Sequence, residues 1–273
     1  MNPIIKYLFF CISLSCSVLF LSSHCSDIDQ SFDGIEETIN RDAQWVEYVK
    51  SKYQHFLYGL DCIFYPAKNP KRLIVSFSYT GSFYGMWSWF WEKDENWNET
   101  AFLFLRDLSG TWYSGSANQS LIDNFSNVIK HFVNISGLSY DKVFTLGIST
   151  GGYAAILYGA LLGCKGALAD IPQFNAEIWQ KNTGNFNPLA AWHDIAKVLR
   201  QTAQLPIISI HHGSFLADAQ AASEFINVLK ERVSTFIIRR TAMTVHWGGT
   251  LKKSFILKEF EYMENQETLV PLV

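Results

Sequence analysis

The chain has little charge, and the charges that it has nearly balance. Charged residues make up 17% of the 273 residues, and the formal net charge is −3 at pH 7. Nucleic-acid-binding proteins usually concentrate lysine and arginine in a basic patch that contacts phosphates. We find no basic stripe, no zinc-ligand spacing and no Walker-type phosphate loop. The sequence therefore gives no case for a nucleic-acid partner, and it implies no metal and no organic cofactor.

Cysteine is also scarce. Of the five cysteines, Cys11 and Cys16 lie in an N-terminal apolar segment, which leaves Cys25, Cys62 and Cys164. An odd number of scattered cysteines does not make a disulfide framework. One bridge is possible, but we expect free, buried thiols.

The N-terminal apolar run is too short for a typical transmembrane helix, which needs ~20 apolar residues. It covers Tyr7–Leu21, follows Lys6 and precedes small and polar residues. This pattern predicts a secretory leader over residues 1–26, with an uncleaved signal anchor as the alternative. A polar tether (27–40) and a single domain (41–273) would follow. We expect a secreted or periplasmic protein that touches a membrane only through an uncleaved N-terminal segment.

After the leader, apolar patterns alternate between those of strands and those of helices. Hydrophobic residues make up 48% of the chain, enough for a sizeable core. We expect a hairpin around Gly59; strands at 73–78, 101–106, 142–148, 166–170, 206–211 and 235–239; and helices at 42–57, 119–136, 150–162, 188–203, 218–231 and 247–264. Such alternation is typical of βαβ units. The predicted fold class is α/β, with a doubly wound, mostly parallel sheet and helices on both faces.

The most informative motif is Gly147-Ile148-Ser149-Thr150-Gly151-Gly152, between an apolar strand pattern and a helix rich in small residues. Gly-x-Ser-x-Gly in this setting is the pattern of a nucleophile elbow. A serine on such a sharp turn has a strained backbone, and side chains two residues away on either side would collide. Ser149 is therefore the predicted nucleophile. The alternative is a glycine-rich turn at the start of a helix.

A serine hydroxyl needs a histidine to take its proton and an acid to orient that histidine. In a doubly wound sheet such groups gather where strands end. His246 follows the last predicted strand and is the predicted base. Asp218 follows the strand at 206–211 and is the predicted acid, although it could simply be a helix N-cap. Asp170, at the end of the strand at 166–170, is the rival acid.

An oxyanion hole requires two donors. We expect one to be the backbone N–H of Thr150, the residue after the nucleophile. The other should come from the loop at 79–82, with Tyr79 first and Thr80 next.

Two aromatic segments are candidates for a substrate pocket. Asp107, Trp112 and Tyr113 follow the strand at 101–106, where loops usually shape a pocket. They are predicted either to contact substrate or to lock the loop by hydrogen bonds. The run at 84–91 is either a pocket wall or a helix packed in the core.

The chain resembles the α/β-hydrolase superfamily over roughly residues 70–265, on the strand–elbow–helix unit and the order Ser149, Asp218, His246. More loosely, it is similar to bacterial O-acetyltransferases of surface polysaccharides. That likeness rests on Phe77-Ser78, Asp107 with Trp112-Tyr113, the glycines around Ser149, Pro172-Gln173 and the segment from Gly213 to Asp218. The resemblance implies Ser149 as nucleophile, Asp218 as acid and His246 as base.

Three functions are consistent with the sequence. The first is a serine hydrolase that cleaves an ester, most simply a carboxylester, through an acyl-enzyme. The second is an O-acyltransferase in which a sugar hydroxyl replaces water. The third is a non-catalytic binding protein on a hydrolase scaffold. The expected partner of the enzyme is a small-molecule or glycan ester.

Overall fold

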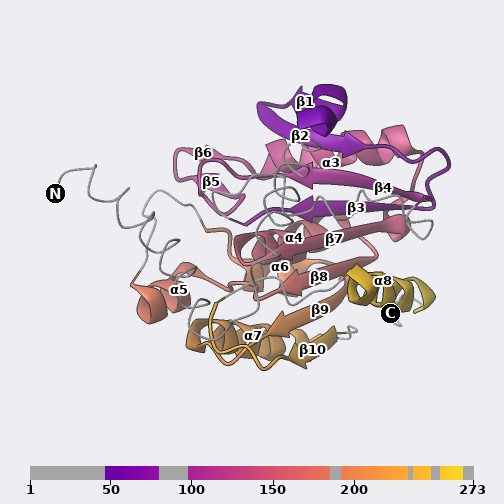
Figure 1. The fold of residues 1–273 in the computed structure, drawn as a ribbon. Helices are drawn as coiled ribbons and strands as arrows, with labels where there is room; N and C mark the ends of the chain where they lie inside the picture. The colour runs from indigo at the N-terminus through magenta and orange to yellow at the C-terminus, as the bar shows by residue number, and fades with distance from the viewer. Residues whose placement is uncertain (1–46, 80–97, 185–191, 233–235, 247–252, 267–273) are drawn as a thin grey trace, which may run out of the picture. The chain divides into compact units, whose positions relative to one another are not determined.

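An eight-stranded mixed sheet organises the computed structural model of the chain (Figure 1). The structure describes residues 47–79, 98–184, 192–232, 236–246 and 253–266. The predicted leader, the tether and the aromatic run at 84–91 lie outside the described residues. The strands of the sheet are β1 (Gln54–Leu57), β2 (Leu60–Tyr65), β3 (Arg72–Phe77), β4 (Thr100–Leu105), β7 (Val143–Ile148), β8 (Gly166–Asp170), β9 (Ile207–His212) and β10 (Phe236–Arg240).

The strand order is β1-β2-β4-β3-β7-β8-β9-β10, which runs from top to bottom in Figure 1. The hairpin β1–β2 is antiparallel, and β2 pairs antiparallel with β4. The remaining pairs, from β4 to β10, are parallel. β7 lies between β3 and β8, so the strand that leads to Ser149 is in the middle of the sheet. Every residue of β4 and β7 is buried, as expected for strands covered on both faces.

Helices cover both faces of this sheet. After the hairpin, the helices of the described residues are α3 (Ile122–Ser136), α4 (Thr150–Leu162), α5 (Ala176–Thr183), α6 (Ile195–Gln201), α7 (Leu216–Lys230) and α8 (Lys253–Asn265), and a short 3-10 helix, η3, spans Tyr140–Lys142. Side chains of α3, α4, α6 and α7 share one buried cluster with Val75 and Ile210 of the sheet. α8 packs on the opposite face, where Phe260 contacts Phe144 of β7. The predicted fold class is confirmed.

Several features differ from the sequence-based expectations, including the helix predicted at 119–136, which begins only at Ile122 because Gln119–Ser120 forms a short strand. The helix expected at 42–57 is helical only over 47–53 of its described part, because Gln54–Leu57 forms β1 and pairs with β2. The helix α5 was not expected, and the one predicted at 188–203 is described as helix only over Ile195–Gln201. A two-stranded ribbon of β5 (Gly115–Ser116) and β6 (Gln119–Ser120) lies outside the main sheet.

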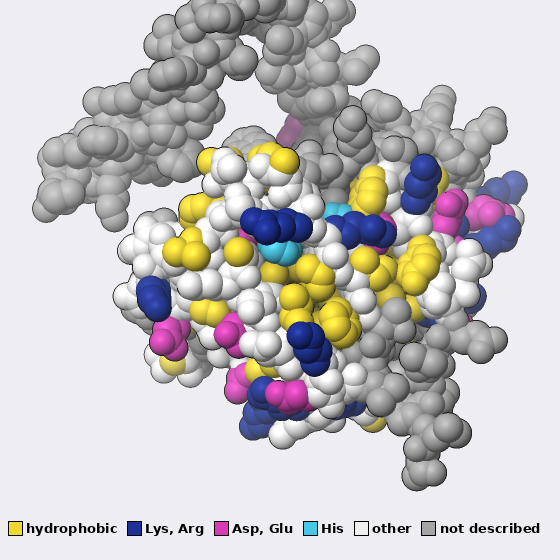
Figure 2. Space-filling view, turned by 90° about the horizontal axis from the view of Figure 1, so that it is seen from below, with side chains coloured by type: hydrophobic (Ala, Val, Ile, Leu, Met, Phe, Trp, Pro, Cys, Tyr) yellow, Lys and Arg dark blue, Asp and Glu magenta, His cyan; other side chains and the backbone are white. Residues whose placement is uncertain are grey.

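β10 ends the sheet, and Phe236, Ile237 and Ile238 on it are half-buried. Viewed from this end, apolar side chains lie among lysines, arginines and carboxylates (Figure 2). All described residues belong to one compact unit. Within the described ranges, no helix combines the length and the apolar character needed to cross a membrane. Cys62 and Cys164 are free and buried, as expected.

Candidate active site

Ser149 lies on a sharp turn between β7 and α4. Its backbone has φ 56° and ψ −117°, a conformation that residues other than glycine rarely adopt. Two backbone hydrogen bonds hold the turn: the Ser149 N–H donates to the Asp170 carbonyl (2.9 Å), and the Tyr153 N–H donates to the Ser149 carbonyl (3.1 Å). Because β8 and α4 are both hydrogen-bonded to the backbone of Ser149, its hydroxyl is fixed at the carboxyl end of the sheet.

The glycines of the motif are required by close backbone packing. A Cβ on Gly147 would lie 2.0 Å from the Gly151 carbonyl oxygen, and a Cβ on Gly151 would lie 2.2 Å from the Phe77 carbonyl oxygen. Real Cβ atoms do not approach backbone oxygens so closely. The sequence-based explanation of these glycines is therefore confirmed. The same contacts bring the end of β3 against the elbow.

Ser149, His246 and Asp218 form one hydrogen-bonded chain. The Ser149 Oγ lies 2.9 Å from His246 Nε2, and His246 Nδ1 lies 2.6 Å from Asp218 Oδ1. These residues are 97 and 28 positions apart in sequence. The fold thus brings together the three side chains that the sequence nominated as nucleophile, base and acid.

Asp218 is in the first turn of α7 and is only 1% exposed. The residue at the N-cap is Phe215, so the alternative reading of Asp218 as an N-cap is wrong. A carboxylate in the first turn of a helix is stabilised by the positive end of the helix dipole. The contact of His246 Nδ1 is with Asp218, whereas the carbonyl of the rival acid, Asp170, holds the elbow. Among the described residues, Asp218 Oδ2 has no hydrogen-bond partner.

An aromatic wall, formed by Trp112, Tyr153, Trp179 and Trp192, stands beside the histidine. The Trp179 ring centroid lies 4.8 Å from that of His246. Trp112 contacts the other three members, with ring centroids 3.7 Å from Trp192, 6.1 Å from Trp179 and 6.2 Å from Tyr153. The wall joins the loop after β4 to α4 and α5. Trp112 and Tyr153 are buried, and Trp179 and Trp192 are the half-buried members of this aromatic wall.

Asp107 organises the loop after β4. Its Oδ1 accepts from the Ser109 N–H (3.0 Å), and its Oδ2 accepts from the Tyr113 N–H (2.9 Å). Trp112 and Tyr113 have φ values of 60° and 59°, which an L-residue adopts only under constraint. Both carboxylate oxygens are thus used within the loop itself, as the loop-locking alternative requires.

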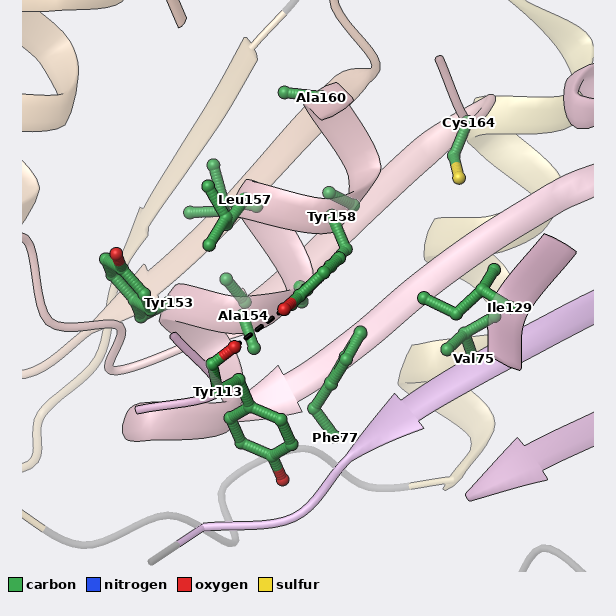
Figure 3. Close-up of a cluster of buried hydrophobic side chains, with 14 of the residues drawn as sticks. Val75, Phe77, Tyr113, Ile129, Tyr153, Ala154, Leu157, Tyr158, Ala160 and Cys164 are labelled. Atoms are coloured by element: carbon green, nitrogen blue, oxygen red, sulfur yellow. Dashed lines mark hydrogen bonds between the residues drawn. The ribbon is translucent and has the colours of Figure 1, made fainter. Parts of the chain in front are cut away.

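Tyr113 connects this loop to the end of β3. It is 1% exposed, and its hydroxyl donates to the Ser78 carbonyl (2.6 Å), next to Tyr79. Its own carbonyl accepts from the Tyr158 hydroxyl of α4 (2.6 Å), the dashed contact in Figure 3. Tyr79 is 42% exposed at the end of β3, and Thr150, 3% exposed, begins α4. The two predicted oxyanion donors therefore lie on segments that pack against each other.

Gln173 was not predicted as a site residue. It follows β8 and is 2% exposed. Its Oε1 accepts from the Ser149 hydroxyl (3.3 Å), and its Nε2 lies 3.1 Å from His246 Nε2. Its position shortly after a strand end was the available signal, but a neutral amide is neither the base nor the acid that a serine nucleophile requires. In the part of the chain that the structure describes, no three His, Cys, Asp or Glu side chains cluster as metal ligands.

No family model matches the sequence, and no curated protein is detectably similar to it. Solved structures are similar in fold. FphF, a fluorophosphonate-binding serine hydrolase of Staphylococcus aureus, has a TM-score of 0.57 at 17% identity, over 76% of this chain and 92% of that one. The capsule O-acetyltransferase of Neisseria meningitidis serogroup A has a TM-score of 0.58 at 13% identity, over 78% and 93%.

A third similar structure is the Glycosylation Associate Protein (Gap123) complex from Streptococcus agalactiae, with a TM-score of 0.58 at 18% identity. The match covers 77% of this chain but only 46% of that one, so this chain matches less than half of it. At such identities the likeness concerns the fold. Together with the sheet order and the elbow after the central strand, it shows that this chain has an α/β-hydrolase-type fold.

Proposed function

We propose that this protein is a serine hydrolase that cleaves an ester through an acyl-enzyme. The observation that carries the proposal is the hydrogen-bonded chain from Ser149 Oγ through His246 to Asp218, at 2.9 and 2.6 Å. A non-catalytic binding protein would have no need for a strained serine in hydrogen-bond contact with an oriented imidazole.

The roles follow from proton positions. Asp218 accepts the Nδ1–H of His246, which leaves a lone pair on Nε2 facing Ser149. His246 takes the serine proton as Ser149 Oγ attacks the ester carbonyl carbon. The backbone N–H groups of Thr150 and Tyr79 hold the oxyanion. His246 then protonates the leaving alcohol, and water, activated by the same imidazole, releases the acid and restores the serine hydroxyl.

The aromatic wall and the loop after β4 form the substrate side of this proposal. Trp179 presents a half-buried apolar ring beside His246, the buried Trp112 packs against it, and Asp107 and Tyr113 hold the loop that carries Trp112. An acyl group or the face of a sugar ring would pack on the Trp179 indole. We therefore infer a small-molecule or glycan ester as substrate.

The second candidate is an O-acyltransferase that uses a glycan as acceptor. It is favoured by the fold likeness to the capsule O-acetyltransferase and to the glycosylation-associated complex. The acyl-enzyme would be the same, and a sugar hydroxyl would replace water in its release. Either activity fits an exported protein, as the N-terminal leader predicts. Incubation with an acyl donor, with and without glycan, separates the two by product: acylated glycan or free acid alone.

The first test is covalent labelling. We expect a fluorophosphonate probe to label the wild-type protein and to leave Ser149→Ala unlabelled, because the probe reacts with activated serines. A wild-type protein that stays unlabelled would favour the binding-protein alternative.

The second test is turnover of p-nitrophenyl esters. We expect His246→Ala to lower turnover at least ~10³-fold, because the serine loses its base. His55→Ala, which removes an exposed imidazole on β1 at the edge of the sheet, is the matched control and should keep wild-type activity. Near-normal turnover by His246→Ala would refute the assignment.

A further inference from the structure

The amide of Gln173 contacts both groups that exchange the proton. Its Oε1 is 3.3 Å from the Ser149 hydroxyl, and its Nε2 is 3.1 Å from His246 Nε2. The side chain is 2% exposed, and the backbone just before it is strained at Ile171, with φ 43°. An uncharged amide held in this position has no part in the proton relay of Ser149, His246 and Asp218.

The protonation state of the histidine fixes what the amide does. Because Nδ1 of His246 donates to Asp218, Nε2 is an acceptor, so the Gln173 N–H must be the donor in that contact. Oε1 then lies 3.3 Å from Ser149 Oγ, whose single proton can be donated either to His246 Nε2 or to Oε1. In the acyl-enzyme Ser149 Oγ carries no proton, so it offers Oε1 no donor, and a buried acceptor without a donor is costly.

We propose that Gln173 positions the second nucleophile, the hydroxylic group that releases the acyl chain. This inference rests on the proposed function. In the acyl-enzyme, Oε1 accepts one O–H of the acceptor, while a second O–H displaces the Gln173 N–H as the donor to the single lone pair of His246 Nε2. Water carries both donors on one oxygen, and a sugar carries them on neighbouring hydroxyls. Gln173 therefore belongs to deacylation, and acylation does not need it.

The atoms of the step balance. The acceptor oxygen forms a bond to the acyl carbon, and the bond from that carbon to Ser149 Oγ breaks. The acceptor proton passes to His246 Nε2 and from there to Ser149 Oγ. Gln173 gives up and gains no proton.

The test separates the two half-reactions with p-nitrophenyl acetate. Gln173→Leu and Gln173→Met keep the bulk of the side chain and remove the amide. Rapid mixing measures acylation by the first release of p-nitrophenol, and acid quenching with mass spectrometry measures the acetylated protein. We expect acylation within about threefold of wild type and deacylation slower by about tenfold or more, so that the acetylated form accumulates. Gln201→Leu, at an exposed position in α6, is the matched control.

Two further measurements test the positioning of the acceptor. Hydroxylamine attacks acyl-enzymes without being positioned, so it should restore turnover in both variants. Ethylene glycol should compete better than ethanol for the acyl group in the wild type, and this preference should shrink in Gln173→Leu. Equal slowing of both half-reactions, or unchanged deacylation, would overturn the role of Gln173. A wild type that never forms the acetylated intermediate would overturn the proposed function as well.

Discussion

At the scale of single residues, the site depends on one unfavourable backbone conformation. Ser149, with φ 56° and ψ −117°, costs roughly 1–3 kcal/mol relative to a relaxed residue. Its two backbone hydrogen bonds, to Asp170 and from Tyr153, offset part of this cost. The conformation requires close backbone packing at Gly147 and Gly151, where a side chain would collide with a backbone oxygen. These glycines are therefore sensitive to substitution.

Gly151→Ala tests this sensitivity. The added methyl group would lie 2.2 Å from the Phe77 carbonyl oxygen, so the elbow and the end of β3 must separate. We expect the free energy of unfolding to fall by at least ~3 kcal/mol, measured by urea denaturation. Gly137→Ala is the control: it has φ 66° and nothing within 4 Å, so it should lose only about 1 kcal/mol. Equal losses in the two variants would contradict the packing argument.

The sequence predicted the residues whose chemistry is distinctive. Ser149 is marked by its glycines, and Asp218 and His246 follow strands in an order that few folds share. Gln173 is less distinctive and contributed only to the family resemblance, because a neutral amide is common on surfaces and its contact with Ser149 spans 24 residues of chain. The first-turn position of Asp218 in α7 was also out of reach, since helix starts are read from sequence to within only a few residues.

At the scale of elements, tyrosine hydroxyls tie the loop after β4 to its neighbours. Tyr113 reaches the Ser78 carbonyl next to the proposed oxyanion donor Tyr79, and Tyr158 of α4 reaches the Tyr113 carbonyl. Each hydrogen bond satisfies a buried carbonyl. Only the bond from Tyr113 reaches the segment that contains the proposed oxyanion donor, Tyr79.

Tyr113→Phe and Tyr158→Phe form a matched pair. Each variant removes a buried 2.6 Å hydrogen bond to a backbone carbonyl, and each should lower the free energy of unfolding by about 1–3 kcal/mol. We expect kcat for ester cleavage to fall about tenfold in Tyr113→Phe and to stay near wild type in Tyr158→Phe. Equal kcat values in the two variants would show that the Ser78 contact does not position the donor.

Elements with strong local patterns were predicted well. The bounds of α4 and β8 match their prediction, because a compact apolar run and flanking glycines mark them. α5 was missed, since its eight residues include Gln, Lys and Asn and bury no side chain fully. The error at Gln54–Leu57 has a different cause: the apolar spacing fits a helix, but pairing with β2 turns the segment into an edge strand.

At the scale of the whole molecule, a polar cluster of the buried residues Ser209, His211 and Glu259 with the exposed Arg239 links α8 to the sheet. Ser209 of β9 donates to Glu259 of α8 (2.8 Å), Arg239 of β10 also donates to Glu259, and His211 lies 3.4 Å from the Ser209 hydroxyl. Burial lowers the pKa of His211 to about 4; Glu259 opposes this shift, while Arg239 and His212 add to it.

This depressed pKa makes stability depend on pH. In the unfolded chain this histidine has an ordinary pKa of about 6.5, so between pH 6.5 and pH 4 it binds a proton that it does not bind in the folded protein. Acid therefore favours unfolding. Because of His211, we expect the free energy of unfolding to fall by about 2 kcal/mol when the pH is lowered from 7 to 5. Urea denaturation of His211→Gln at pH 7 and at pH 5 should not show this fall in the free energy of unfolding. If the free energy of unfolding falls as much in the variant as in the wild type, His211 is not its cause.

The distance along the chain between Ser149 and His246, 97 residues, has a consequence for biosynthesis. A ribosome completes the nucleophile and its elbow long before it adds the imidazole, so the growing polypeptide carries a serine that nothing can activate. Reactivity begins only when the last loop has been made and folded against α7. Under the proposed function, an enzyme made in this order is inactive throughout translation and meets ester substrates only after it has folded.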